Sequence, residues 1–164
     1  MLDCAGIPGQ LLENELFGHT RGAFTSAHSE EKGLAAAADC STLFIDEVDS
    51  LPHASQARLL RLVEERTYKP LGSPRCVRAD IRAIAAANRD LEALMKQGDF
   101  RSDLYYRLNV ARIHIPLRER RGDILLIARH FLQRICAAGG YGRKYFAPSV
   151  MAALEEGMCC NFRK

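Results

Sequence analysis

The chain has 164 residues, of which 48% are hydrophobic and 26% are charged, and its formal net charge is only +3. This balance is typical of one globular domain with at most a small appendage, and it excludes a mostly disordered chain. No apolar run reaches the roughly 20 residues that span a bilayer, and the N-terminus lacks a basic start followed by an apolar segment. We therefore expect a cytoplasmic protein.

Charge and cysteine usage exclude two further classes. The small net charge gives no argument for a nucleic-acid partner. Basic residues are in excess only over residues 118–164, where a solvated helical face is the commoner interpretation and phosphate binding the rarer one. The six cysteines include no Cys-x-x-Cys pair and the five histidines are scattered, so we expect reduced thiols and no structural metal site.

In chain order, the sequence predicts short strands that alternate with helices, and then helices alone. The predicted strands are Met1–Ala5, Thr42–Ile45, Ile81–Ala87 and Ala111–Ile115, the second and third being buried in a parallel sheet. The predicted helices are Gln10–Leu16, a turn at Gly33–Ala38, Pro52–Glu65, Asp90–Gln97 with Asp90 as its cap, Asp103–Leu108, one from Asp123 to Gly139, and one that starts at Pro148. Gly18–Ser29 is predicted to be a loop, and Leu71–Pro74 a turn between two short extended pieces. This order predicts an α/β layer followed by a small helical subdomain.

Two carboxylates end the second predicted strand. The apolar run Leu43–Ile45 stops abruptly at Asp46 and Glu47. Open α/β sheets bind ligands at the carboxyl ends of their strands. In nucleotide hydrolases, one carboxylate there holds the hydration shell of magnesium and the next polarises the attacking water. Asn88 ends the following strand and is suited to sensing a phosphate or orienting water, although an ordinary polar turn after each strand is the alternative.

Two other segments carry unusual side chains. Arg101 and Arg107 are six residues apart and are suited to stabilising a neighbouring subunit's phosphate charge as arginine fingers. Surface pairing with nearby aspartates is the alternative. Phe24 lies between glycine and small residues, where burial in a partner would stabilise it. The alternative is that its ring folds back onto its own core.

These segments, in this order and spacing, resemble the AAA+ central domain of bacterial sigma-54-dependent transcriptional activators. The resemblance covers essentially the whole chain and is carried by Glu15–Ala27, Phe100–Asn109 and Leu117–Asp123. It implies an α/β fold, an AAA+ P-loop NTPase-type parallel sheet with helices on both faces, over residues 1–117. It implies part of an α-helical lid over residues 118–164.

The resemblance also implies roles for particular residues. Asp46 would coordinate Mg²⁺ through water, Glu47 would activate water, and Asn88 would be the first sensor of a bound ATP. Arg101 and Arg107 would reach the nucleotide of the adjacent subunit, which requires a homo-oligomer that is a hexameric ring in the family. The loop that contacts sigma-54 would consist of Gly22, Ala23, Phe24, Thr25, Ser26 and Ala27. Thr67–Asp80 resembles a second, pore-facing hairpin.

The chain departs from the family pattern in several places. Ser26 stands where the family loop has its second glycine. Asp3 stands where the family has an asparagine that restrains the catalytic glutamate as a switch, and an aspartate there would place negative charge near Glu47. Arg163 falls at the second, nucleotide-contacting sensor, but most of the motif around it is absent.

The chain contains no Gly-x-x-x-x-Gly-Lys-Ser/Thr phosphate loop and no identifiable DNA-recognition helix. We therefore expect a piece of the family's domain that is cut at both ends, with no direct DNA binding. Three hypotheses stay open: an ATPase fragment that remodels the closed promoter complex, a non-hydrolysing module that only binds sigma-54 or related subunits, and a remnant without a role.

Overall fold

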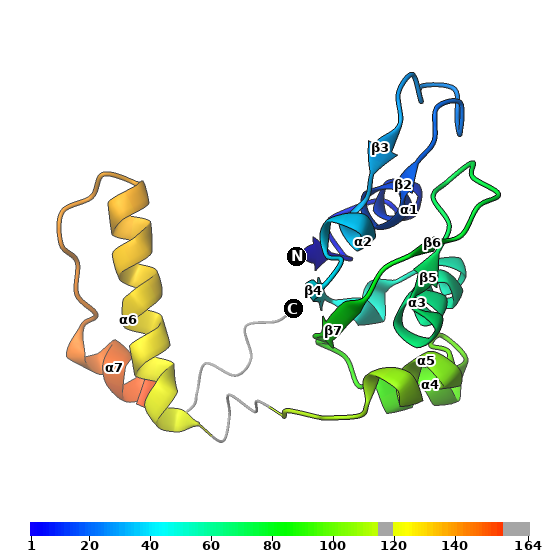
Figure 1. Ribbon diagram of the computed structural model, residues 1–164. Coiled ribbons are helices and arrows are strands. Elements are labelled where there is room, and N and C mark those ends of the chain that lie inside the picture. Colours follow the sequence, from blue (N-terminus) through cyan, green and yellow to red (C-terminus); the bar gives the residue numbers. More distant parts are fainter. Residues whose placement is uncertain (115–119, 156–164) are drawn as a thin grey trace. The chain divides into compact units, whose positions relative to one another are not determined.

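The computed structural model describes residues 1–114 and 120–155. The described residues belong to two compact units, Met1–Arg112 and Ile113–Lys164 (Figure 1). Arg163 and the domain boundary predicted between residues 117 and 118 lie outside the described residues. Within the described part, no helix is both long enough and apolar enough to cross a membrane.

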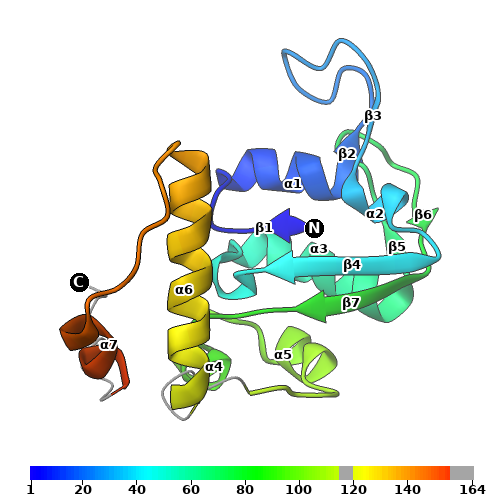
Figure 2. The same cartoon turned by 90° about the vertical axis from the view of Figure 1, so that its left-hand side faces the viewer.

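A three-stranded parallel sheet organises the first unit, as the alternation of strands and helices predicted. Its strands are β1 (Leu2–Asp3), β4 (Ser41–Asp46) and β7 (Ile81–Ala85), in the order β1-β4-β7. Figure 2 shows the three strands side by side with β4 in the middle. Leu43 and Ile45 project from β4 into the core and are almost completely buried. The central strand is therefore fixed on both edges and on one face.

The helices of this unit cover the sheet. They are α1 (Gly9–Phe17), α2 (Leu34–Ala37), the 3-10 helix η1 (Val48–Ser50), α3 (His53–Glu65), α4 (Leu91–Gln97) and α5 (Ser102–Leu108). Helix α3 packs against α5 and β7, and its buried face includes Leu59 and Leu62. Asp90 caps α4 as predicted, because its carboxylate accepts a hydrogen bond from the Glu92 backbone N–H.

Two short antiparallel hairpins extend from the unit. One pairs β2 (Gly18–His19) with β3 (Glu31–Lys32), and the other pairs β5 (Thr67–Tyr68) with β6 (Val77–Arg78). The prediction that all of Gly18–Ser29 is loop was therefore wrong at its first two residues. The second pair agrees with the prediction of a turn between two extended pieces.

Two strand predictions need correction. We expected Ile81–Ala87 to be buried, but along β7 partly buried side chains alternate with exposed ones, and Ile84 is 43% exposed. The reason is that β7 has only β4 beside it within the described residues. We also expected a strand at Ala111–Ile115, but residues 111–114 form none and Ile113 is 85% exposed. Apolar β-branched residues there have no neighbouring strand in the described chain with which to pair.

The described residues of the second unit form two helices, α6 (Arg121–Ala138) and α7 (Pro148–Glu155), which contact each other. Gly139 ends α6 and Pro148 starts α7, as the sequence predicted. The apolar stripe predicted on the first of these helices is present, but Phe131 and Ile135 on it are more than half exposed.

Candidate functional site at the carboxyl edge of the sheet

The end of β4 delivers two carboxylates to the edge of the sheet. Asp46 is the last residue of the strand, and its Oδ1 accepts the Glu47 backbone N–H at 3.0 Å. Glu47 follows with φ +50° and ψ +46°, a left-handed conformation that is rare for a residue with a Cβ. Such conformations persist only where the surroundings enforce them, and they concentrate at functional sites.

Asn88 meets Glu47 at this edge. The Asn88 Nδ2 donates to Glu47 Oε1 at 2.8 Å, and the Asn88 backbone N–H donates to Asp49 Oδ1 at 3.1 Å. The backbone around them is tied as well, because Ala86 N–H donates to the Ile45 carbonyl and Val48 N–H donates to the Ala86 carbonyl. We call Asp46, Glu47 and Asn88 the acid edge. The sequence singled out these residues at the ends of two different strands, and in the structure they lie together.

Asp3 lies beside the acid edge without a hydrogen bond to Glu47 in the described structure. It pairs in register with Asp46, and its Oδ1 accepts the backbone N–H groups of Ala5 and Gly6 at 3.0 and 3.2 Å. Its carboxylate therefore stabilises its own turn, while Asn88 is the residue that contacts Glu47. The switch role of Asp3 remains a prediction.

Cys4 directly follows Asp3, and sequence reasoning assigned it no role beyond that of a reduced thiol. The side chain is buried, and its backbone N–H donates to the Asp46 carbonyl at 3.1 Å. Burial, and then the negative charges of Asp3 and Asp46, raise the pKa of the Cys4 thiol to about 12. The thiol is therefore neutral and unreactive at physiological pH.

The two predicted arginine fingers have partners within the chain. Arg101 Nε and Nη2 donate to the two carboxylate oxygens of Asp103 at 3.0 and 2.6 Å. This bidentate pairing lowers the pKa of Asp103 and raises that of Arg101. Surface pairing with Asp103, the alternative left open by the sequence, is therefore present.

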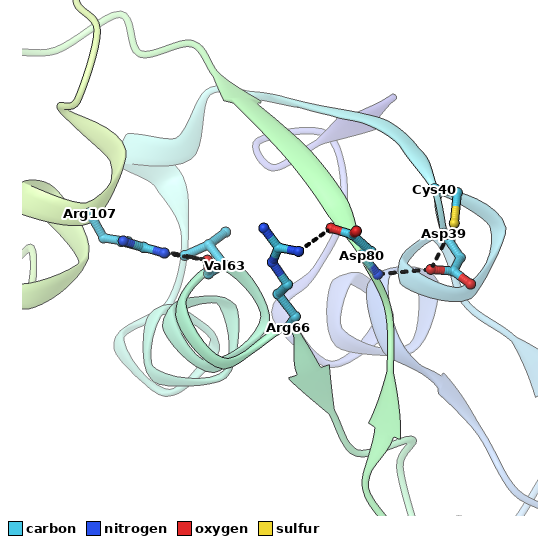
Figure 3. A network of polar contacts seen from close by, with 6 residues as sticks. All are labelled: Asp39, Cys40, Val63, Arg66, Asp80 and Arg107. Atoms are coloured by element: carbon cyan, nitrogen blue, oxygen red, sulfur yellow. Dashed lines mark hydrogen bonds and ion pairs between the residues drawn. The ribbon is translucent and has the colours of Figure 1, made fainter.

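Arg107 contacts the end of a neighbouring helix. Its Nε and Nη2 both donate to the Val63 carbonyl in the last turn of α3, each at 3.4 Å (Figure 3). In the same view Arg66 pairs with Asp80 at 2.8 Å, and the Asp80 backbone N–H donates to Asp39. A cation at a helix C-terminus is electrostatically favourable, so this contact orients Arg107 without burying it.

The Phe24 loop, residues 20–30, joins β2 to β3. The Phe24 ring is 43% exposed and lies 4.9 Å from the His19 ring, so it does not fold back into the core. Gly22 N–H donates to the Ala27 carbonyl, and Ala27 N–H donates to the Phe24 carbonyl, which closes the tip. The base is tied to the second hairpin, because Thr20 N–H donates to the Leu71 carbonyl at 3.0 Å.

The donor set of the acid edge suits a metal that keeps most of its water. Within the parts of the chain that the structure describes, no group of three or more His, Cys, Asp or Glu side chains could hold a metal ion. Magnesium needs no such cage, because it is bound through one or two carboxylates together with waters and substrate phosphates. A single carboxylate, Asp46, at the end of a central strand fits that mode of binding.

The parallel order of the strands and the acid pair at their carboxyl edge define an α/β domain with its ligand edge where open sheets have it. The comparison with known families gives a sharper result. The family model for the sigma-54 interaction domain matches residues 1–114 of this chain. The chain therefore belongs to the sigma-54 interaction domain family.

Curated relatives are regulatory proteins. The chain is 50% identical over 134 residues to the regulatory protein AtoC of Escherichia coli strain K12, covering 81% of this chain and 29% of AtoC. It is 47% identical over 154 residues to the transcriptional regulatory protein ZraR of the same strain, covering 93% of this chain and 35% of ZraR. It is 43% identical over 162 residues to the Nif-specific regulatory protein of Bradyrhizobium diazoefficiens, covering 98% of this chain and 27% of that relative. The chain thus spans about a third of the relatives' length.

Solved structures agree with the fold. The crystal structure of NtrX from Brucella abortus has a TM-score of 0.82 at 29% identity, covering 93% of this chain and 34% of NtrX. NtrX has also been crystallised in complex with ADP and with ATP, and each of those structures matches with a TM-score of 0.76. The predicted fold class, an α/β domain of the AAA+ type, is confirmed by this likeness.

Proposed function

We propose that this chain is the part of a sigma-54-dependent transcriptional regulator that contacts sigma-54 and supplies the hydrolytic side chains of an ATP site. The observation that carries the proposal is the 2.8 Å hydrogen bond from Asn88 to Glu47 beside Asp46. It joins an acid suited to activating water with an amide suited to sensing a phosphate. Membership of the sigma-54 interaction family and the ATP complex of NtrX support the same proposal.

In this proposal each residue of the acid edge has one task. Asp46 holds the hydration shell of Mg²⁺, and Glu47 takes a proton from the attacking water. Asn88 keeps the Glu47 carboxylate in place, because its amide donates to one carboxylate oxygen and leaves the other free to accept. Bound Mg-ATP supplies the phosphoryl bond that is broken and the charge that the site must neutralise.

Arg101 and Arg107 act on a neighbouring subunit in this proposal. Asp103 occupies only Nε and Nη2 of the Arg101 fork, so the remaining N–H groups are free to donate to a phosphate. Arg107 stays exposed while it rests on Val63. Both side chains are therefore accessible to a second copy of the domain, which favours a homo-oligomeric ring.

The second candidate function is a module that binds sigma-54 without hydrolysing ATP. One observation favours it. The Phe24 loop is closed and supported entirely by residues of this chain, whereas the 164 residues contain no phosphate-loop motif. Contact with sigma-54 is common to both candidates, so it is the property to test first.

The binding test compares two exposed apolar side chains. Labelled sigma-54 is titrated with the chain, with Phe24→Ala and with the control Leu11→Ala, whose side chain is 59% exposed on α1. We expect Phe24→Ala to weaken binding by about 30-fold or more, the loss typical of an interface hot spot, and Leu11→Ala to have little effect. Equal binding by Phe24→Ala and the unaltered chain would contradict the proposal.

Hydrolysis separates the two candidates. We expect no ATP turnover from the chain alone, because the charge-assisted contacts of a phosphate loop are missing from its sequence. Turnover that disappears in Glu47→Gln would remove the non-hydrolysing candidate. Sigma-54 binding in the same Glu47→Gln variant should be unchanged, since the acid edge lies outside the Phe24 loop.

A further inference from the structure

One buried amide connects the segment that follows Glu47 to the segment that carries Arg101. Gln56, on α3, is completely buried, which is unusual for a polar side chain. Its Nε2 donates to the backbone carbonyls of Leu51 and Asp99, both at 3.0 Å. Its Oε1 accepts the backbone N–H of Arg101 at 2.9 Å. All three contacts go to backbone groups outside α3.

The surroundings fix the orientation of this amide. Two carbonyl oxygens face one end of it and an N–H group faces the other, so only one arrangement of the amide N and O satisfies all partners. An apolar side chain of the same length would leave these three backbone groups without their partners, and the hydrogen bond to Leu51 among them is buried. Burial of unpaired polar groups is costly, so the segments would have to move to find water.

The first of the two segments is the one that follows Glu47. Leu51 directly follows η1, and this turn is tied back by Ser50 N–H, which donates to the Glu47 carbonyl at 2.8 Å. Glu47 holds its left-handed conformation at the start of this turn. A hydrogen bond at Leu51 therefore acts on a rigid unit that begins with the acid.

The second segment leads into α5. Asp99 and Arg101 enclose Phe100, which is buried, and Arg101 is the residue that precedes the first turn of the helix. The Arg101 carbonyl already accepts the Tyr105 N–H. The contact between Arg101 N–H and Gln56 therefore sets where the chain enters α5 and from where the guanidinium projects.

We propose that Gln56 is a positioning residue, which fixes from one buried amide both the segment that follows Glu47 and the backbone of Arg101. The inference rests on the proposed function for the roles of Glu47 and Arg101. Gln56 touches neither nucleotide nor guanidinium. Gln56 thereby keeps Glu47, which acts within its own subunit, at a constant distance from Arg101, which acts on the neighbouring subunit.

Amide hydrogen exchange tests the positioning directly, without any activity. Gln56→Met keeps the length of the side chain and removes its hydrogen bonds. The control is Ser55→Ala on the same helix, because Ser55 is equally buried but its hydroxyl donates to Glu13, away from both segments. We expect exchange at the Arg101 amide to become at least tenfold faster in Gln56→Met and to stay unchanged in Ser55→Ala.

Unchanged protection of Arg101 in a folded Gln56→Met would overturn the proposal. If Gln56→Met does not fold, Gln56→Asn, which keeps a shorter amide, replaces it with the same expectation.

A complementation assay tests whether this positioning affects ATP turnover. The chain is added to a variant of AtoC of Escherichia coli in which the residues at the two positions that align with Arg101 and Arg107 are replaced by alanine. We expect the unaltered chain and Ser55→Ala to restore ATP turnover, Arg101→Ala to restore none, and Gln56→Met to restore at least tenfold less. The loss should fall on kcat with an unchanged KM for ATP, because Gln56 does not contact the nucleotide. Full restoration by Gln56→Met overturns the proposal. If the unaltered chain restores nothing, the proposed action of Arg101 on a neighbour fails, while the exchange experiment still decides the role of Gln56.

Discussion

The acid edge and the Phe24 loop are held in opposite ways. Asp46, Glu47 and Asn88 extend directly from the parallel strands, and the strand beneath them is anchored by buried Leu43 and Ile45. The Phe24 loop leaves the body through a two-residue hairpin and is supported by backbone hydrogen bonds within itself and to the second hairpin. Its Phe24 ring is 43% exposed and lies against the His19 ring.

The difference follows from what each region has to do. A group that transfers protons must keep its position to within a fraction of an ångström, so it belongs on buried secondary structure. A group that inserts into a partner must be reachable, and its burial free energy is gained only on binding. The chain therefore holds the acid edge on its packed core and holds the Phe24 loop on the short, glycine-rich β2–β3 hairpin.

The largest expected effect is the loss of the core beneath the acid edge. Ile45→Ala should reduce the free energy of unfolding by about 3–4 kcal/mol, because Ile45 is completely buried and its neighbours cannot collapse around the cavity. Urea unfolding measures the change. The matched control is Ile84→Ala on the adjacent strand, where the side chain is 43% exposed and the loss should stay below about 1 kcal/mol. Equal losses for the two variants would show that β4 is not the buried support of the site.

The next effect concerns the base of the Phe24 loop. Gly18 has φ +71° and ψ −177°, a conformation that is essentially restricted to glycine. A Cβ there would lie 2.3 Å from the Glu31 carbonyl oxygen and 2.5 Å from the Gly33 nitrogen, both backbone atoms. Gly18→Ala should therefore cost about 3 kcal/mol from strain, separate β2 from β3 and abolish sigma-54 binding.

Gly22 at the tip gives the control for that variant. Its φ is +82°, but a Cβ would meet nothing within 4 Å. Gly22→Ala should therefore cost only about 1–2 kcal/mol of backbone strain and leave the β2–β3 pairing intact. Cross-strand amide exchange at His19 distinguishes the two outcomes. Equally fast exchange in both variants would mean that the tip determines the β2–β3 pairing as much as the base does.

The sequence predicted what local chemistry determines. The apolar run before Asp46, the proline before α3 and the capping Asp90 placed β4, α3 and α4 to within a residue or two. The meeting of Glu47 and Asn88 was also predictable, because neighbouring parallel strands end at the same edge. Periodicity, capping and strand direction are all encoded over a few residues.

What the sequence did not predict depends on distant partners. Gln56 reads as an ordinary helical residue, and only the folded chain brings Leu51, Asp99 and Arg101 around it. Residues 111–114 have the composition of a strand, yet no strand of the described chain lies beside them. Whether Arg101 would pair with Asp103 was left open for the same reason, since side-chain direction is set by tertiary packing.

The effect that is smallest at physiological pH is the pH dependence that Cys4 gives to the free energy of unfolding. Its folded pKa of about 12 lies above the value of 9.0 for an unperturbed thiol, because burial and the adjacent carboxylates oppose the thiolate. The stabilisation linked to the neutral thiol is therefore complete below pH 9 and is lost as the pH rises from 9 towards 12. The difference in unfolding free energy between the unaltered chain and Cys4→Ala should be constant from pH 7 to 8.5. It should then shrink by at most about 1.4 kcal/mol per pH unit above 9.

Thiol labelling gives an independent measure of the same burial. Cys40 and Cys76 are exposed, whereas Cys4 is buried. At pH 8, a disulfide reagent should modify Cys40 and Cys76 within minutes and Cys4 only when the chain is unfolded in urea, because the thiolate is the reactive form. Phe24→Ala should leave this pattern unchanged, since the loop does not cover the sheet, while Ile45→Ala should expose Cys4 by increasing the population of unfolded chain. Native-state labelling of Cys4 at the rate of Cys40 would mean that the acid edge is as open as the Phe24 loop, and the contrast between the two supports would fail.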